Sequence, residues 1–298
     1  PIYKNTKLWM YCIVSKLVIN GCSMTWGGGF LQSFLLEKAK ELNVPHCECV
    51  NNEELSKDSN ITAREYARRR QSKKGIYHGE FCRPGENCTY EIVRKYITYP
   101  YKLSKLLDVD ELIDLSKPGR SCQYVVRTTI DFFLERLDED LSDYIVIPQF
   151  PNGNRFEYWN DDIYTSSGPP SKGWQSYMIA HSNSKDIVHY FGNEMYSFYN
   201  MTNSLMQLGS FLKENNIRYY LSTEGQAFSD LAEANKIVKR RIEYIDTNYS
   251  ILGGEIYNSR LVGKEVPFEE VRIPGDGHYS EDGHTVAANN IYRLINDR

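Results

Sequence analysis

The chain has 298 residues, of which 41% are hydrophobic, so it is long enough to bury a substantial core within one large domain. It contains 35 lysines and arginines and 39 aspartates and glutamates, which gives a net charge of -4. This balance does not favour nucleic acid or an anionic membrane as the main partner. A small soluble substrate or a neutral polymer fits the composition better.

The apolar segment at 8–19 is interrupted by Ser15 and Lys16, is too short to span a bilayer and lacks a small-residue cleavage site. The seven cysteines are an odd number scattered along the chain, which suits a reducing compartment better than a disulfide framework. We therefore expect a soluble cytoplasmic protein, or one of the host cytoplasm or virion if it is viral.

The first predicted element is a strand over 16–20, an apolar run that ends at Gly21. A segment with helical periodicity follows over 30–42. The range 44–98 is polar, contains cysteines and carries a basic run at 64–74, so we expect an insertion after the first helix.

Apolar runs and helical patterns alternate from residue 99 onward. The predicted helices are 99–107, 122–137, 187–215, 229–244 and 281–296, and the predicted strands or extended stretches are 111–115, 143–147, 217–222 and 271–274. Range 148–186 is rich in Asn, Gly, Pro, Ser, Trp and Tyr without clear periodicity, which is typical of a long loop or cap. The alternation predicts a single α/β domain over 1–298, with a mostly parallel sheet covered on both faces.

Four polar or glycine positions follow predicted strands. Ser23, Gly119 and Asn152 each lie just beyond a strand, and His278 follows the last extended stretch. Ligands bind at the carboxyl ends of the strands in such sheets. We therefore expect these four residues to converge on one edge.

Two short motifs at opposite ends of the chain supply the groups of a serine hydrolase. A serine hydroxyl is a poor nucleophile and needs a base held by a third group. Ser23 lies in GCSMT at a sharp turn, and His278 and Asp276 lie in DGH. Taken alone, Ser23 is also typical of a helix cap, and His278 of a capping or surface histidine. His284, at the start of the last helix, is expected to pack or cap.

The motifs resemble those of the SGNH, or GDSL-like, hydrolases, especially the divergent GCSxT members common in phage and environmental sequences. GCSMT matches the first block, Gly119 in LSKPGRS the second and DGH the last. In the third block, a buried strand followed by G-x-N, Phe150 stands at the glycine and Asn152 at the asparagine. The resemblance covers 17–37 and 99–298.

This resemblance implies a three-layer α/β/α fold with a flavodoxin-like sheet. It implies that Ser23 is the nucleophile, that His278 is the general base and then the general acid, and that Asp276 orients the imidazole. The backbone N–H groups of Ser23 and Gly119, with the Asn152 side chain, would form the oxyanion hole.

The departure in the third block leaves the side-chain donor of the oxyanion hole open. Asn152, Gln149 and Asn154 are alternative donors, and catalysis would be weak without one. A catalytically weak SGNH-like binding or structural protein, for example in a virion, therefore remains an alternative hypothesis.

The favoured function is hydrolysis of a small acyl ester through an acyl-enzyme, with acetyl on a carbohydrate as one candidate. Trp26, Tyr158 and Trp159 are the expected substrate-binding residues, because aromatic rings stack on sugars. An O-acyltransferase using the same triad is the other alternative, and a lysophospholipid or a thioester is a further candidate substrate.

Two weaker patterns point elsewhere. The five His and Cys residues at 46–49, 82 and 88 lack the spacing of a common zinc module. The basic run at 64–74 is more typical of a solvated helix face than of a nucleic-acid site. We expect no metal, no cofactor, no nucleic acid and no membrane partner, and the sequence leaves the oligomeric state open.

Overall fold

A mostly parallel sheet forms the centre of the computed structural model, which describes residues 15–22, 25, 32–44, 89–117, 119–160, 173–178, 193–224, 229–256, 259–262, 266–273 and 278–296. The strand order is β2-β1-β3-β6, with β7 also pairing with β3. These strands are β1 (Lys16–Asn20), β2 (Glu111–Asp114), β3 (Tyr144–Phe150), β6 (Arg218–Tyr219) and β7 (Ser222–Thr223).

The central strand β1 pairs in parallel with β2 and β3, and β3 pairs in parallel with β6 and β7. Isolated bridges from Leu221 to Ile251 and from Thr223 to Arg260 extend the sheet further. This order, in which the chain moves to one side of β1 and then returns to the other, is that of a flavodoxin-like sheet. The predicted α/β fold class is confirmed.

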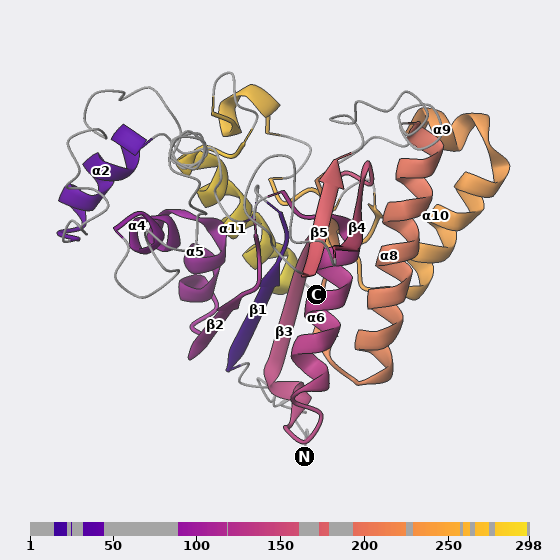
Figure 1. The fold of residues 1–298 in the computed structure, drawn as a ribbon, viewed down its shortest axis with the longest axis horizontal. Helices are drawn as coiled ribbons and strands as arrows, with labels where there is room; N and C mark the ends of the chain where they lie inside the picture. Colours follow the sequence, from indigo (N-terminus) through magenta and orange to yellow (C-terminus); the bar gives the residue numbers. More distant parts are fainter. Residues whose placement is uncertain are drawn as a thin grey trace, which may run out of the picture.

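Helices cover both faces of the sheet. Successive strand residues point to opposite sides, and the residues on both sides are apolar, so each face packs against helices. Val18 and Val146 pack in the core beneath α6, α8 and α10, whereas Leu17, Ile19 and Ile145 pack beneath α5 and α11. Figure 1 shows α4, α5 and α11 on one side of the sheet and α6, α8 and α10 on the other. The helices are α2 (Gln32–Glu41), α4 (Thr89–Ile97), α5 (Tyr99–Leu106), α6 (Cys122–Leu134), α8 (Glu194–Glu214), α9 (Ser229–Ala234), α10 (Lys236–Asn248) and α11 (Glu281–Asn296), with 3-10 turns at Leu141–Asp143 and Phe268–Val271.

Three elements differ from the sequence-based expectation. The range predicted as a long loop contains the antiparallel pair β4 (Arg155–Asn160) and β5 (Gly173–Met178). The predicted helix at 229–244 is two helices, because the Asn235 side chain accepts the N–H groups of Ile237 and Val238 and begins α10. The predicted strand at 217–222 is split into β6 and β7.

The end of the predicted insertion is helical. In the range 44–98 the structure describes residue 44 and residues 89–98, and α4 packs against α2 and α5. The division of 1–298 into one domain with an insertion and a cap stays a prediction.

Candidate active site

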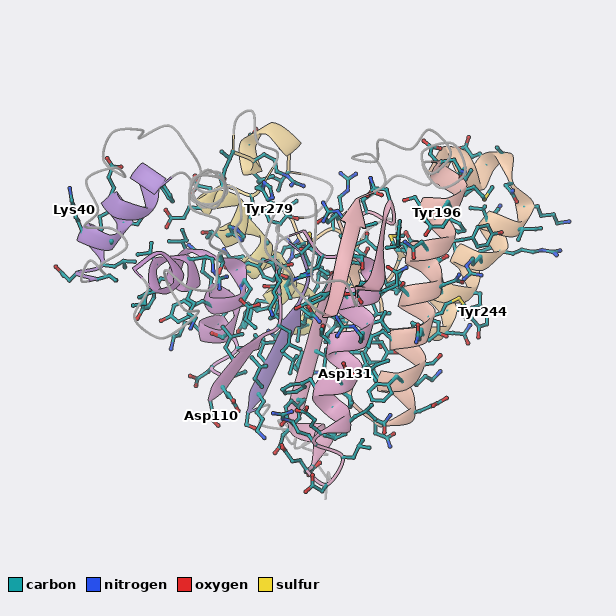
Figure 2. All side chains as sticks on the ribbon, in the orientation of Figure 1. Lys40, Asp110, Asp131, Tyr196, Tyr244 and Tyr279 are labelled. Carbon is teal, nitrogen blue, oxygen red and sulfur yellow. The ribbon has the colours of Figure 1, made fainter. Side chains whose placement is uncertain are left out.

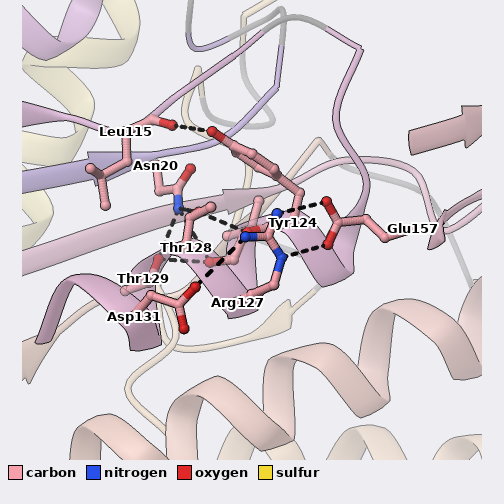
Figure 3. Close-up of polar contacts among 9 residues, drawn as sticks. Asn20, Leu115, Tyr124, Arg127, Thr128, Thr129, Asp131 and Glu157 are labelled. Carbon is pink, nitrogen blue, oxygen red and sulfur yellow. Dashed lines mark hydrogen bonds and ion pairs between the residues drawn. The ribbon is translucent and has the colours of Figure 1, made fainter. Parts of the chain in front are cut away.

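The turn that follows β1 is fixed by the buried side chain of Asn20. Its Nδ2 donates to Val125 O at 3.2 Å and to the hydroxyls of Thr128 and Thr129 at 2.8 and 2.9 Å (Figure 3). Its Oδ1 accepts the N–H of Gly21 at 2.8 Å. Asn20 therefore ties the carboxyl end of β1 to α6 and sets the direction in which the chain leaves the strand.

Gly21 and Thr25 are in contact across the segment that carries Ser23. A Cβ on Gly21 would lie 2.1 Å from Thr25 Oγ1, so the close approach requires glycine. The Thr25 hydroxyl donates to Gln149 Oε1 at 2.5 Å and is thereby tied to β3. Ser23 itself and Trp26 lie outside the described residues, but both ends of the Ser23 segment are held at the carboxyl edge of the sheet.

The loop after β2 runs beside the same turn. Leu115 N–H donates to Ile19 O at 2.8 Å, and Lys117 N–H donates to Gly21 O at 3.2 Å. Gly119 follows with φ of 75°, a left-handed conformation that favours glycine, and no atom lies within 4 Å of a Cβ built on it. The structure thus brings the loop of Gly119 to the turn that precedes Ser23.

Two side-chain amides, Gln149 in β3 and Asn152 just after it, differ in the hydrogen bonds that they make. Asn152 Oδ1 accepts from the Asn154 N–H at 3.1 Å and from the Ser197 hydroxyl at 2.8 Å, so its carbonyl is used in shaping the loop. Gln149 is fully buried, with its Oε1 bonded to Thr25. Among the described residues, Asn152 Nδ2 makes no hydrogen bond. Gln149 Nε2 is buried without a partner of good hydrogen-bond geometry and lies near Tyr279, whose pKa the Gln149 side chain lowers. Asn152 therefore retains a donor, and the Gln149 donor lies beside the residue that follows His278.

His278 lies on one of two extended arms that precede α11. The arms are joined by Ile273 N–H to His278 O at 2.8 Å and Ser280 N–H to Val271 O at 2.9 Å, with Arg272 opposite Tyr279. Asp276 belongs to the connection between the arms, which lies outside the described part of the chain. Tyr279 and Asp110, which precedes β2, are at opposite ends of the sheet (Figure 2), so the His278 arm is at the carboxyl edge.

The second histidine of DGHYSEDGH is part of the core. His284 is 0% exposed, and its Nδ1 accepts the Tyr99 N–H at 3.2 Å. Its ring stacks on Tyr99 and meets the Tyr279 ring edge-on. Burial, reinforced by the charges of Lys102 and Arg94, lowers the pKa of His284 to about 3. His284 is therefore a neutral packing residue.

This low pKa makes a prediction for acid stability. The unfolded chain binds a proton at His284 near pH 6.5 and the folded chain only near pH 3. The unfolded state therefore binds more protons in this window, and the folded state loses about 1.4 kcal/mol of stability per pH unit as the pH falls through it. His284→Gln should remove this slope. Urea unfolding from pH 7 to 3.5 measures it, and equal slopes in both proteins would contradict the assignment.

An acidic residue that the sequence analysis missed lies at the same edge. The buried Cys22 thiol, next in sequence to Ser23, donates to Glu224 Oε1, and Glu224 N–H donates to Phe150 O at 3.0 Å. Burial raises the pKa of Tyr279 to about 12, and the neighbouring Glu224 and Cys22 add to the rise. The sequence did contain a signal for this residue, because Glu224 comes two residues after the predicted strand at 217–222, where site residues are expected.

Other predicted binding groups are placed only in part. Tyr158 and Trp159 lie on β4, with Gln175 and Trp174 as their backbone partners on β5.

In the part of the chain that the structure covers, no three His, Cys, Asp or Glu residues are grouped to hold a metal ion. No described helix is long and apolar enough to cross a membrane. The candidate zinc residues at 46–49, 82 and 88 lie outside the described ranges.

Comparisons with known proteins include distant structural likenesses, two of which are described below. No protein-family model and no curated protein matches the chain. One similar structure is a protein from Slackia heliotrinireducens provisionally assigned as an SGNH hydrolase, 9% identical with a TM-score of 0.39, covering 95% of this chain and 99% of its own. Another is a carbohydrate esterase whose active site is described as having divergent catalytic and non-catalytic binding functions, 13% identical with a TM-score of 0.36, covering 95% and 69%. At this similarity neither protein indicates an activity for this chain.

Proposed function

We propose that this protein is a serine-dependent ester hydrolase of the SGNH type. One observation carries the proposal: the sequence neighbours of the two proposed reacting residues lie in the same buried cluster. Cys22, which precedes Ser23, and Tyr279, which follows His278, belong to the same buried cluster although they lie far apart in the sequence. A nucleophile and a base must be within hydrogen-bond reach, and this packing favours that arrangement.

The proposed reaction proceeds through an acyl-enzyme. The Ser23 hydroxyl attacks the ester carbonyl while His278 takes its proton, and Asp276 stabilises the imidazolium. The C–O bond to the alcohol breaks, and His278 returns the proton to the leaving oxygen. Water, deprotonated by His278, then attacks the carbonyl of the acyl-enzyme. The bond from that carbonyl to Ser23 Oγ breaks, His278 returns the proton to Ser23 Oγ, and the acid is released.

The oxyanion of the tetrahedral intermediate would be held by the backbone N–H groups of Ser23 and Gly119. The Lys117 to Gly21 hydrogen bond supports this pairing, because it joins the two loops that carry these groups. Either Asn152 Nδ2 or Gln149 Nε2 would supply the third donor. Preorganised donors of this kind each contribute about a hundredfold to a thousandfold in rate.

For the substrate we propose a small acyl ester, with a carbohydrate alcohol as the first candidate. The aromatic residues Tyr158 and Trp159 on β4, together with Trp26, support a sugar-binding role because such rings offer apolar faces.

A fluorophosphonate probe tests the nucleophile directly. The wild type should be labelled and should hydrolyse 4-nitrophenyl acetate, whereas Ser23→Ala should lose labelling and fall to the uncatalysed rate. Ser142→Ala, a change of an exposed serine in the turn before β3, is the matched control and should behave as wild type. Equal labelling of wild type and Ser23→Ala would refute the proposal. Acyl transfer to an added sugar in place of water would identify an O-acyltransferase.

A further inference from the structure

Two arginines stand beside the loop of Gly119. Arg120 directly follows Gly119, and Arg155 is the first residue of β4. Arg155 Nη1 donates to the backbone carbonyl of Arg120 at 3.1 Å, which joins the start of the β4–β5 hairpin to the loop after β2. Both side chains are half-buried at the carboxyl edge of the sheet.

Neither guanidinium has a carboxylate partner in the described residues. Arg120 lies over the Tyr124 ring, 5.1 Å from its centroid, and Arg155 makes the single hydrogen bond to Arg120 O. The Nε atoms of both are buried without a hydrogen-bond partner within the described ranges. Burying the donors of a charged group without acceptors is costly, so such groups in native structures point to an absent partner.

The neighbouring acids are engaged elsewhere. Glu157 is held by Arg127 through two hydrogen bonds of 3.1 and 3.0 Å, and Arg127 also lies 3.6 Å from Asp131 (Figure 3). The Glu157 side chain is 3% exposed, and both of its carboxylate oxygens accept hydrogen bonds from Arg127.

Glu224 is a further carboxylate at this edge of the sheet, and its Oε1 accepts the Cys22 thiol hydrogen. Burial raises the pKa of the Cys122 thiol, Glu224 raises it further, and the positive charge of Arg155 opposes the rise. Arg155 and Glu224 therefore both lie close enough to Cys122 for their charges to act on its buried thiol. In the part of the chain that is described, no ion pair joins Arg155 to Glu224.

We propose that Arg120 and Arg155 form a binding site for an anionic group of the substrate, a carboxylate or a phosphate. Arginine presents planar forks of N–H donors that match both groups. Because Arg120 adjoins Gly119, the bound anion would lie next to the proposed oxyanion hole, so the preferred ester carries a negative charge near its scissile bond. The anion site itself stands on the arginines alone, whereas its place in substrate recognition rests on the proposed hydrolase function.

Binding is tested without catalysis by calorimetric titration with succinate and with inorganic phosphate at fixed ionic strength. Wild type and Ser23→Ala should bind one or both anions, and the stronger of the two identifies the group. Arg120→Gln and Arg155→Gln should each weaken binding about tenfold to hundredfold, the range of a charge-assisted hydrogen bond. Arg240→Gln, the same change at an exposed position of α10, is the control and should bind as wild type.

Substrate preference is tested with 4-nitrophenyl acetate and 4-nitrophenyl hemisuccinate. The ratio of kcat/KM for the charged ester to that for the neutral ester should fall about tenfold or more in each Gln variant, and Arg155→Lys should restore part of it. Circular dichroism establishes that each variant is folded.

The outcomes separate the two proposals. If Ser23-dependent hydrolysis occurs but anion binding is equal in wild type, Arg120→Gln and Arg155→Gln, the anion site is overturned and the hydrolase stands. If no ester is cleaved but anion binding depends on both arginines, the site stands and the hydrolase fails. Should Arg155→Gln not fold, Arg120→Gln and Arg155→Lys decide the question.

Discussion

His278→Gln is expected to lower kcat for 4-nitrophenyl acetate by about a thousandfold to ten-thousandfold while leaving the fold intact. Loss of a general base that also activates the nucleophile has an effect of this size or larger. The fold should survive because the arm carrying His278 is joined to its neighbour by backbone hydrogen bonds, including Ile273 N–H to His278 O. Steady-state kinetics and thermal melting of the same preparation measure both quantities.

The control for this prediction is the other histidine of the motif. His284→Gln should retain kcat within about threefold, because His284 is buried and its Nδ1 is occupied by the Tyr99 N–H. Glutamine offers an oxygen to that donor, so it is a fair replacement. If His284→Gln lost activity and His278→Gln kept it, the proposed base would be wrong.

The α/β architecture was predictable because its signals are local. The runs KLVIN and DYIVI are apolar enough to be buried on both faces, and Gly21 ends the first of them with a residue that the close contact with Thr25 requires. The final helix was predicted with its observed bounds, Glu281–Asn296. Each of these features depends on residues within one short stretch.

Features made by distant residues were not predictable from the sequence. The β4–β5 hairpin depends on pairing across twelve intervening residues, and composition alone indicated a loop there. The Cys22–Glu224 contact joins positions 202 residues apart. Nothing in the sequence shows that Arg127 engages Glu157 and leaves Arg155 without a carboxylate. The sequence therefore predicted a set of reacting residues, which stays a prediction, whereas the electrostatic surroundings of the candidate site required the structure.

Gly21→Ala should damage both stability and catalysis, because the added methyl group meets the end of the Ser23 segment. Its Cβ would lie 2.1 Å from Thr25 Oγ1 and 2.8 Å from Thr25 Cβ, distances that the backbone must open to relieve. Overpacking of this kind costs about 1–3 kcal/mol of unfolding free energy. A shift of about 1 Å at the nucleophile lowers kcat roughly a hundredfold.

A double-mutant cycle with Thr25→Gly identifies the cause. Thr25→Gly removes both atoms that the new methyl group would strike, at the cost of the hydrogen bonds that join the Thr25 hydroxyl to Gln149 and Tyr99. If the clash is responsible, Gly21→Ala should destabilise the Thr25→Gly background by at least about 1 kcal/mol less than it destabilises the wild type. Strict additivity in urea unfolding would show that Gly21 and Thr25 are not in contact. Coupling in stability together with partial recovery of kcat would tie the activity to the contact that holds the Ser23 segment at the edge of the sheet.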